Sequence, residues 1–189
     1  MPPSLLDPRV MVMVPRAERA ALTALWKLEA RLFGVVAQRR EVVLAQIKLA
    51  WWRERLAQVA DAPQALPKGE PLLAELAATW GRRASLAPIA DAYEAIMLAE
   101  DGEALALAGT GLAAAMQVGA AWGLSRAALL AGDTVLHAAM WRRVVAEPIA
   151  ISPRFARTLD RWAQLQAKQG GAVSALAEGW LLLRAGVGF

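Results

Sequence analysis

The sequence predicts an all-α protein, and three of its features support that prediction. The 189 residues include 43 Ala and 28 Leu, against only 14 Val, 5 Ile and 5 Thr. Unbranched side chains keep more rotamer freedom in a helix than β-branched ones do. Signals for helix ends recur along the chain, and no segment alternates apolar and polar residues over a convincing length. We therefore expect one helical bundle that spans residues 1–189 as a single domain.

Apolar periodicity predicts the first two helices. Residues 16–38 carry an apolar stripe at helical spacing, made of Leu22, Trp26, Phe33 and Val36. Residues 41–60 carry an apolar face made of Leu49, Trp52, Leu56 and Val59. The proline-containing segment 61–71 cannot continue the second helix and is expected to be a loop.

Six further helices complete a bundle of about eight. We expect them at 70–80, 86–100, 103–122, 125–146, 153–168 and 171–184. Glycines mark the expected helix ends, at Gly81, Gly102, Gly123 and Gly170–Gly171. Ser152 followed by Pro153 predicts a helix start, because serine caps the first free N–H groups and proline is tolerated at the first helical position.

The composition excludes several classes of site. The chain has no Cys and one His, which excludes disulfides, thiolate zinc sites, Cys nucleophiles and metal centres with several histidines. With 57% hydrophobic residues, the domain can bury a core without such cross-links. The net charge is +4, but Lys and Arg are scattered, so we expect no nucleic-acid partner. An anionic partner such as a diphosphate or a lipid head group suits this charge better.

We expect a cytoplasmic protein that can contact the inner face of the membrane peripherally. Residues 1–15 do not show the pattern of a secretory signal. The uncharged run 104–125 is long enough to cross a bilayer, but it is rich in Ala and Gly and poor in Leu. We interpret this run as a tightly packed buried helix.

Glu29 lies in the middle of the apolar stripe of 16–38. A carboxylate on an apolar face must be hydrated, paired or functional, because burying it unpaired is costly. The favoured interpretation is an ion pair with a neighbouring helix, through Lys48 or an Arg. A role in ligand binding is the alternative.

Other polar and aromatic residues can be interpreted as structural or as functional. His137 has no obvious Ser or Cys to activate, so a hydrogen-bonded structural role is favoured. Asp91 and Glu94 can share a helix face, but solvation is more plausible for them than catalysis. Four tryptophans could line a cavity for an apolar ligand, but core packing is the favoured interpretation. They are Trp26, Trp52, Trp122 and Trp141.

The segment Lys48–Leu56, which reads KLAWWRERL, resembles the R-L-x-W-W-R-[DE]-x-L signature of the squalene/phytoene synthase family, with Lys48 in place of the usual Arg. The segment Glu70–Leu76 is similar to the family's H-P-[VL]-x-x-x-L motif, and the Gly132 to Arg142 spacing is similar to a later family helix. The resemblance covers about residues 16–146. It implies an all-α isoprenoid-synthase fold with a central cavity, and positions Lys48, Trp51, Trp52, Arg53 and Arg142 match the motifs.

Active members of that family condense prenyl diphosphates, and the resemblance implies two aspartate-rich helical motifs that hold Mg²⁺. This sequence departs from both. Where the first aspartate-rich motif is expected, the chain has Glu29 as its one acid, with Arg31 beside it. Where the second is expected, Arg143 takes the place of an aspartate, and Glu147 is the next acid. The chain is also shorter than full-length synthases, so a truncated bundle is expected. These departures resemble the non-catalytic branch of the family, which includes a complex I assembly factor.

We therefore expect a synthase-like protein without catalytic residues, metal or cofactor, which binds an apolar lipid or isoprenoid or a protein partner. The alternative is a divergent prenyltransferase that condenses prenyl diphosphates with Mg²⁺. The hypothetical ligand cavity consists of Glu29, Phe33, Lys48, Trp52, Arg53, His137, Trp141 and Arg142.

Overall fold

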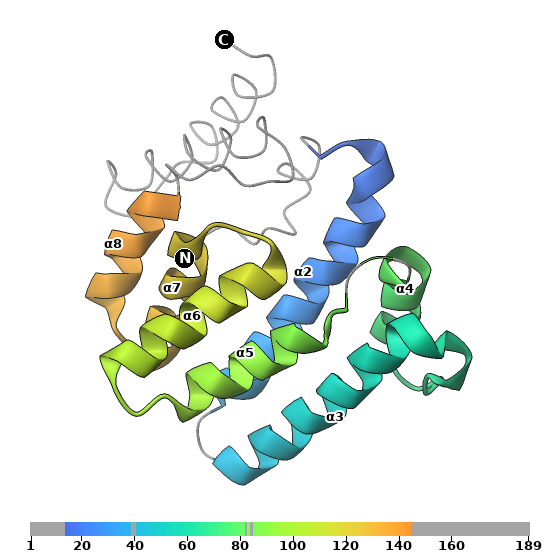
Figure 1. The fold of residues 1–189 in the computed structure, drawn as a ribbon, viewed down its shortest axis with the longest axis horizontal. Helices are drawn as coiled ribbons and strands as arrows, with labels where there is room; N and C mark the ends of the chain where they lie inside the picture. The colour runs from blue at the N-terminus through green and yellow to red at the C-terminus, as the bar shows by residue number, and fades with distance from the viewer. Residues whose placement is uncertain (1–13, 39–40, 82, 84, 145–189) are drawn as a thin grey trace.

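The computed structural model describes residues 14–38, 41–81, 83 and 85–144, with the backbone alone for 141–144. Within these ranges the chain forms seven α-helices and no strand, which confirms the all-α prediction. The helices are α2 (Arg16–Ala37), α3 (Val42–Asp61), α4 (Pro71–Trp80), α5 (Ala87–Leu98), α6 (Gly102–Met116), α7 (Ala120–Ala131) and α8 (Thr134–Val144) (Figure 1). A short 3-10 turn, Pro63–Ala65, lies in the loop after α3.

The first four helices begin and end within a few residues of their predicted limits, but the next two predictions are wrong in detail. The helix expected at 103–122 ends at Met116, because Gln117 adopts a left-handed backbone with φ of 55°. The helix expected at 125–146 is two helices, which Gly132 separates with φ of 81°. The described residues between 16 and 144 therefore form seven helices where six were expected. The helices predicted at 153–168 and 171–184 lie outside the described residues.

Gly123 is inside α7, and not at the helix end that the sequence predicts. It lies where α7 crosses α6 against Gly109. A Cβ atom on Gly123 would stand 1.9 Å from the carbonyl oxygen of Gly109 and 2.8 Å from the Cβ atom of Ala113. The two backbones thus meet at a distance that only glycine permits. This crossing explains why the uncharged run 104–125 is rich in small residues. Separately, no helix of the described part is long and apolar enough to span a bilayer.

The core lies between α2 and the helices that surround it. α2 contacts α3, α4 and α5, and its buried face includes Leu22, Trp26 and Val36, as its apolar stripe predicts. Trp26 meets Trp122 of α7 edge to face, with ring centroids 5.3 Å apart. The buried side chains of the predicted α3 face, Leu49, Trp52, Leu56 and Val59, join the same cluster.

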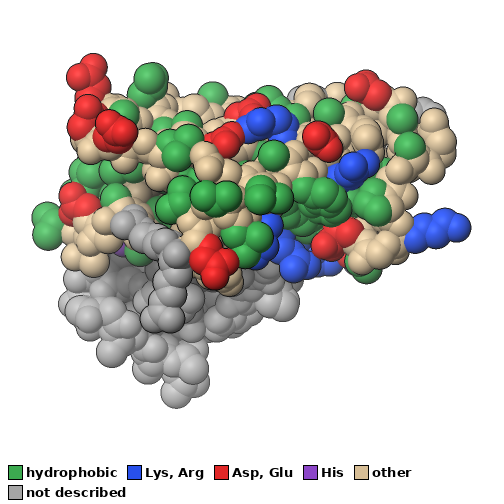
Figure 2. All heavy atoms as spheres, turned by 90° about the horizontal axis from the view of Figure 1, so that it is seen from below, with side chains coloured by type: hydrophobic (Ala, Val, Ile, Leu, Met, Phe, Trp, Pro, Cys, Tyr) green, Lys and Arg blue, Asp and Glu red, His purple; other side chains and the backbone are tan. Residues whose placement is uncertain are grey.

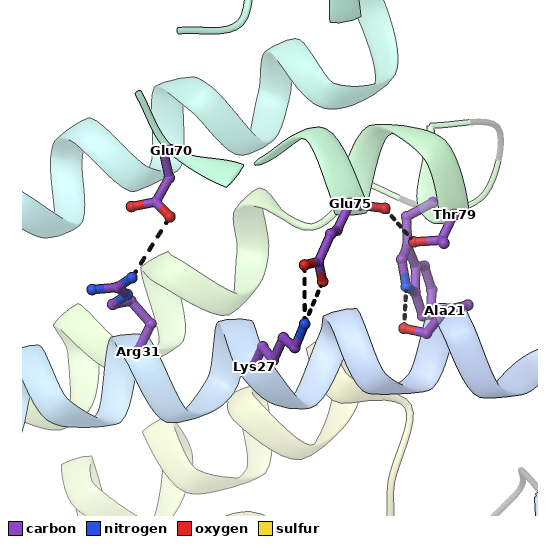
Figure 3. A network of polar contacts seen from close by, with 7 residues as sticks. Ala21, Lys27, Arg31, Glu70, Glu75 and Thr79 are labelled. Carbon is purple, nitrogen blue, oxygen red and sulfur yellow. Dashed lines mark hydrogen bonds and ion pairs between the residues drawn. The ribbon is translucent and has the colours of Figure 1, made fainter. Parts of the chain in front are cut away.

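Polar contacts connect α4 to α2 (Figure 3). Lys27 Nζ lies 2.7 Å from a carboxylate oxygen of Glu75, and Arg31 lies 3.6 Å from Glu70. The indole N–H of Trp80 donates to the carbonyl oxygen of Ala21 at 2.7 Å. Exposed ion pairs contribute about 0–1 kcal/mol each, so these contacts orient α4 while the apolar core supplies its stability.

The crossing of α6 and α7 predicts opposite effects for two glycine substitutions. Gly123→Ala should lower the free energy of unfolding by about 1–3 kcal/mol, because the added methyl group forces the two backbones apart. Gly111→Ala, on the exposed side of α6 with no atom near its Cβ position, should raise stability by up to about 1 kcal/mol. Chemical denaturation of both variants measures this difference, and equal effects would show that the close crossing is absent.

Candidate functional site

Glu29 is the buried acid of the described residues, with 3% of its surface exposed. Its Oε1 atom accepts hydrogen bonds from Nε and Nη2 of Arg126 at 2.8 and 2.5 Å. The same oxygen accepts a hydrogen bond from the Tyr93 hydroxyl at 2.6 Å. These contacts join α2, α5 and α7. The favoured interpretation of Glu29 as the partner of an Arg on a neighbouring helix is therefore confirmed, and Lys48 takes no part in it.

Two aromatic rings complete the surroundings of Arg126. Its guanidinium carbon lies 4.2 Å from the ring centroid of Phe33 and 5.8 Å from that of Trp122. Guanidinium groups are attracted to aromatic faces, and the attraction grows where water is excluded. Phe33, one turn after Glu29, thus covers the cation that Glu29 binds. We call Glu29, Arg126, Tyr93, Phe33 and Trp122 the buried ionic cluster.

Tyr93 acts in this cluster as a permanent hydrogen-bond donor. Burial raises the pKa of its hydroxyl well above the ordinary value, and the neighbouring Glu29 carboxylate raises it further. A tyrosinate here would place a second negative charge beside Glu29. The hydroxyl therefore remains protonated at neutral pH, and it donates one of the hydrogen bonds that the Glu29 carboxylate accepts.

Arg53 forms a second ionic contact, between α3 and α5. Its Nε donates to Asp91 and its Nη2 donates to Glu94. The two acids share a face of α5, as their spacing predicts, but both bind Arg53 instead of standing free in solvent. The side chains remain partly exposed, so the contact is a surface clamp between two helices.

These two ionic contacts bear on the Mg²⁺ that the resemblance implies. The acid at the first motif position, Glu29, already has the Arg126 guanidinium and the Tyr93 hydroxyl on one oxygen. The acid pair on α5 is likewise bound by Arg53. A divalent cation would have to displace an arginine at either place. The donors present in the described part of the chain therefore do not fit a magnesium diphosphate site, and no three potential ligands gather there.

His137 contacts Ser125, a neighbour that the sequence interpretation missed. The His137 Nδ1 atom lies 2.8 Å from the Ser125 hydroxyl and 3.0 Å from the Ser125 carbonyl oxygen. Ser125 is completely buried on α7, so a substrate cannot reach its hydroxyl. The pair connects α8 to α7, which agrees with the favoured structural role of His137. The glycine-rich start of α7 gave no sequence signal that this serine faces α8.

The structure places the residues of the hypothetical ligand cavity on three helices, α2, α3 and α8. Glu29 and Phe33 lie together in the buried ionic cluster, Trp52 is in the core, and Arg53 lies between α3 and α5. Lys48 is exposed on α3, and His137 is on α8. Of the four tryptophans considered as cavity walls, Trp26, Trp52 and Trp122 are buried in the core. The side chains of Trp141 and Arg142 are outside the described part of the structure.

Two hollows open at the end of the bundle where α3 begins. Hollow A has a volume of about 510 Å³ and lies between the ends of α2 and α5 and the starts of α3 and α6. Its apolar walls include Val36, Val42, Ile96, Met97 and Leu130, and Glu100 and Asp101 lie on one side. Hollow B has a volume of about 530 Å³ and lies on the other side of the α3 start. It is lined by Val35, Leu44 and Lys48, among others.

The buried ionic cluster predicts an unusual titration of Tyr93. Because the pKa of Tyr93 is raised on folding, its contribution to stability is fully present below the ordinary tyrosine pKa of about 10 and is lost as pH rises above it. Tyr93 is the one tyrosine of the chain, so tyrosinate absorbance reports it alone. The folded protein should show no tyrosinate signal one unit above that ordinary pKa, whereas the chain in denaturant should. A midpoint near 10 in the folded state would contradict the cluster.

Comparison with known proteins adds no assignment. The chain matches no protein-family model, no curated protein and no solved structure. The likeness of Lys48–Leu56 to the synthase signature stays a prediction from the sequence, and function has to be argued from the geometry of the described residues.

Proposed function

We propose that this chain is a degenerate squalene/phytoene synthase-like protein, with an isoprenoid-synthase type of bundle, that binds an apolar lipid or isoprenoid chain without condensing prenyl diphosphates. The observation that carries the proposal is the engagement of Glu29 by Arg126. Glu29 is the acid nearest to the first metal-binding motif of the family pattern, and its charge is already used inside the protein.

The cost of releasing Glu29 supports a non-catalytic role. Arg126 is four-fifths buried, and separating a buried ion pair leaves an uncompensated charge that costs about 3–5 kcal/mol. A metal site built on Glu29 would carry that cost in every cycle of ligand binding. The alternative, a divergent prenyltransferase, needs Glu29 together with Glu147, and Glu147 lies outside the described residues.

The two hollows support an apolar ligand. Their volumes fall in the range of about 300–1,000 Å³ that small-molecule sites occupy. Aliphatic side chains line part of both hollows, together with Gln38, Glu100 and Asp101 in hollow A and Gln38, Glu41 and Lys48 in hollow B. An apolar chain gains free energy by leaving water for such walls.

One experiment with two readouts tests the proposal on the full chain. Geranylgeranyl diphosphate with Mg²⁺ should give no condensed product, because arginines already bind Glu29 and the acid pair of α5, which leaves neither place to hold the metal that assists departure of the diphosphate. Radiolabelled geranylgeraniol should bind in equilibrium dialysis. Ala131→Trp, which fills hollow A from its rim, should weaken that binding by about tenfold or more.

The matched control is Ala106→Trp, at an exposed alanine of α6 that lines neither hollow. It should leave the binding of geranylgeraniol unchanged. Turnover of the diphosphate would contradict the non-catalytic role. Absent binding, or equal losses in both variants, would contradict the ligand site.

A further inference from the structure

Exposed hydrophobic side chains concentrate on one helix. Among the described residues, nine large hydrophobic side chains are exposed, and five of them lie on the first three turns of α3. Val43, Ile47 and Trp51 recur every four residues and are 69%, 61% and 37% exposed, with Leu44 beside them. We call these four residues the α3 stripe. The α3 stripe does not pack against the core, because the core contacts the opposite face of α3.

The α3 stripe lies on an outer side of the bundle. α3 forms the lower edge of the molecule in Figure 1. Seen from below, hydrophobic side chains form a broken band across the middle of the molecule, with Lys and Arg and Asp and Glu side chains beside it (Figure 2). Trp51 stands edge to face on the buried Trp52, with ring centroids 5.1 Å apart, which fixes the outer indole against the core.

Charged side chains border the α3 stripe: Glu41 is exposed directly before α3, and a lysine, an arginine and a second glutamate follow along the helix. Lys48 is exposed on one flank, next to Leu44 and Trp51, and it forms no ion pair within the described part of the chain. Arg55 follows two turns later on the same flank. Glu54 ends the apolar part on the outward face, one turn after Trp51. The stripe is therefore short, roughly 12 Å from Val43 to Trp51. Lys48 lies beside it, and the aliphatic part of a lysine side chain can lie along an apolar surface while its ammonium group stays in water.

The size and shape of the α3 stripe decide between its possible occupants. A stable interface between two proteins buries about 800 Å² on each partner, and four partly exposed side chains on one convex helix cover less than that. An aromatic ring, branched aliphatic side chains and a free lysine on one outer helix face are instead what the interface of an anionic bilayer accommodates. The lysine head can stay among the lipid phosphates while the apolar side chains enter the acyl boundary.

We propose that the first half of α3 docks this protein on the surface of an anionic lipid bilayer, with Val43, Leu44, Ile47 and Trp51 inserted and Lys48 at the head groups. Glu54 limits the insertion to the first half of the helix. Leu44 and Lys48 also line hollow B, so the docked face and that hollow adjoin. The docking needs no ligand in either hollow, and it can hold whether or not the proposed isoprenoid binding does.

Vesicle co-sedimentation of the full chain tests this docking. The protein should bind vesicles of phosphatidylcholine and phosphatidylglycerol, and less so vesicles of phosphatidylcholine alone. The double variant Val43→Ser/Ile47→Ser should lower the partition coefficient about tenfold or more, because it removes the most exposed half of the stripe. Lys48→Gln should lower it about fivefold on anionic vesicles, the effect of about 1 kcal/mol for one lysine near such a surface, and leave it unchanged on neutral ones.

The matched control is Leu107→Ser/Val135→Ser, which removes two still more exposed side chains, 75% and 79%, from α6 and α8. It changes no charge and should bind vesicles as the unchanged protein does. Equal losses in both double variants, or no binding by the unchanged protein, would overturn the proposal. Sedimentation velocity supplies the remaining outcome: a dimer that Val43→Ser/Ile47→Ser converts to a monomer would assign the stripe to a second copy of the chain and overturn membrane docking.

Discussion

The fold depends on the compensation of one buried carboxylate. Glu29 lies within the apolar stripe of α2, where an unpaired negative charge would be very costly. Its partners come from residues 64 and 97 positions further along the chain, so α5 and α7 have to pack where Tyr93 and Arg126 reach it. Arg126 in turn needs cover from water, which Phe33 and Trp122 provide. The position of three helices thus follows from one acid and the groups that satisfy it.

The ion pairs between helices and the apolar surfaces that can meet other molecules lie in different parts of the structure. Glu29 and the acids of α5 each have an arginine of another helix as partner, so these ion pairs join helices of the bundle. The apolar surfaces lie elsewhere, in the two hollows at the start of α3 and on the α3 stripe. The described geometry thus separates the ion pairs that join helices from the exposed apolar surfaces.

Local signals in the sequence predict much of this fold. The stripes of α2 and α3 identify their buried faces, and a carboxylate inside a stripe by itself indicates an ion pair. The sequence does not identify Arg126 as the partner of Glu29, because Arg126 is 97 residues away and nothing near it marks it as buried. The left-handed turn at Gln117 is also hidden, since glutamine rarely adopts positive φ and Gly119 and Gly123 are the more obvious places for an end. The prediction for Gly123 is wrong because a glycine for close packing and a glycine for a helix end look alike in one sequence.

The free energy of coupling between Glu29 and Arg126 tests the central role of the cluster most directly. A double-mutant cycle with Glu29→Leu, Arg126→Met and both together, followed by chemical denaturation, isolates that term. Each single variant should lose stability, and the double variant should be more stable than Glu29→Leu alone, because two apolar side chains can replace a buried ion pair with little loss. The expected coupling is about 2 kcal/mol or more. Effects that add within about 0.5 kcal/mol would mean that the two residues act independently and would contradict the account.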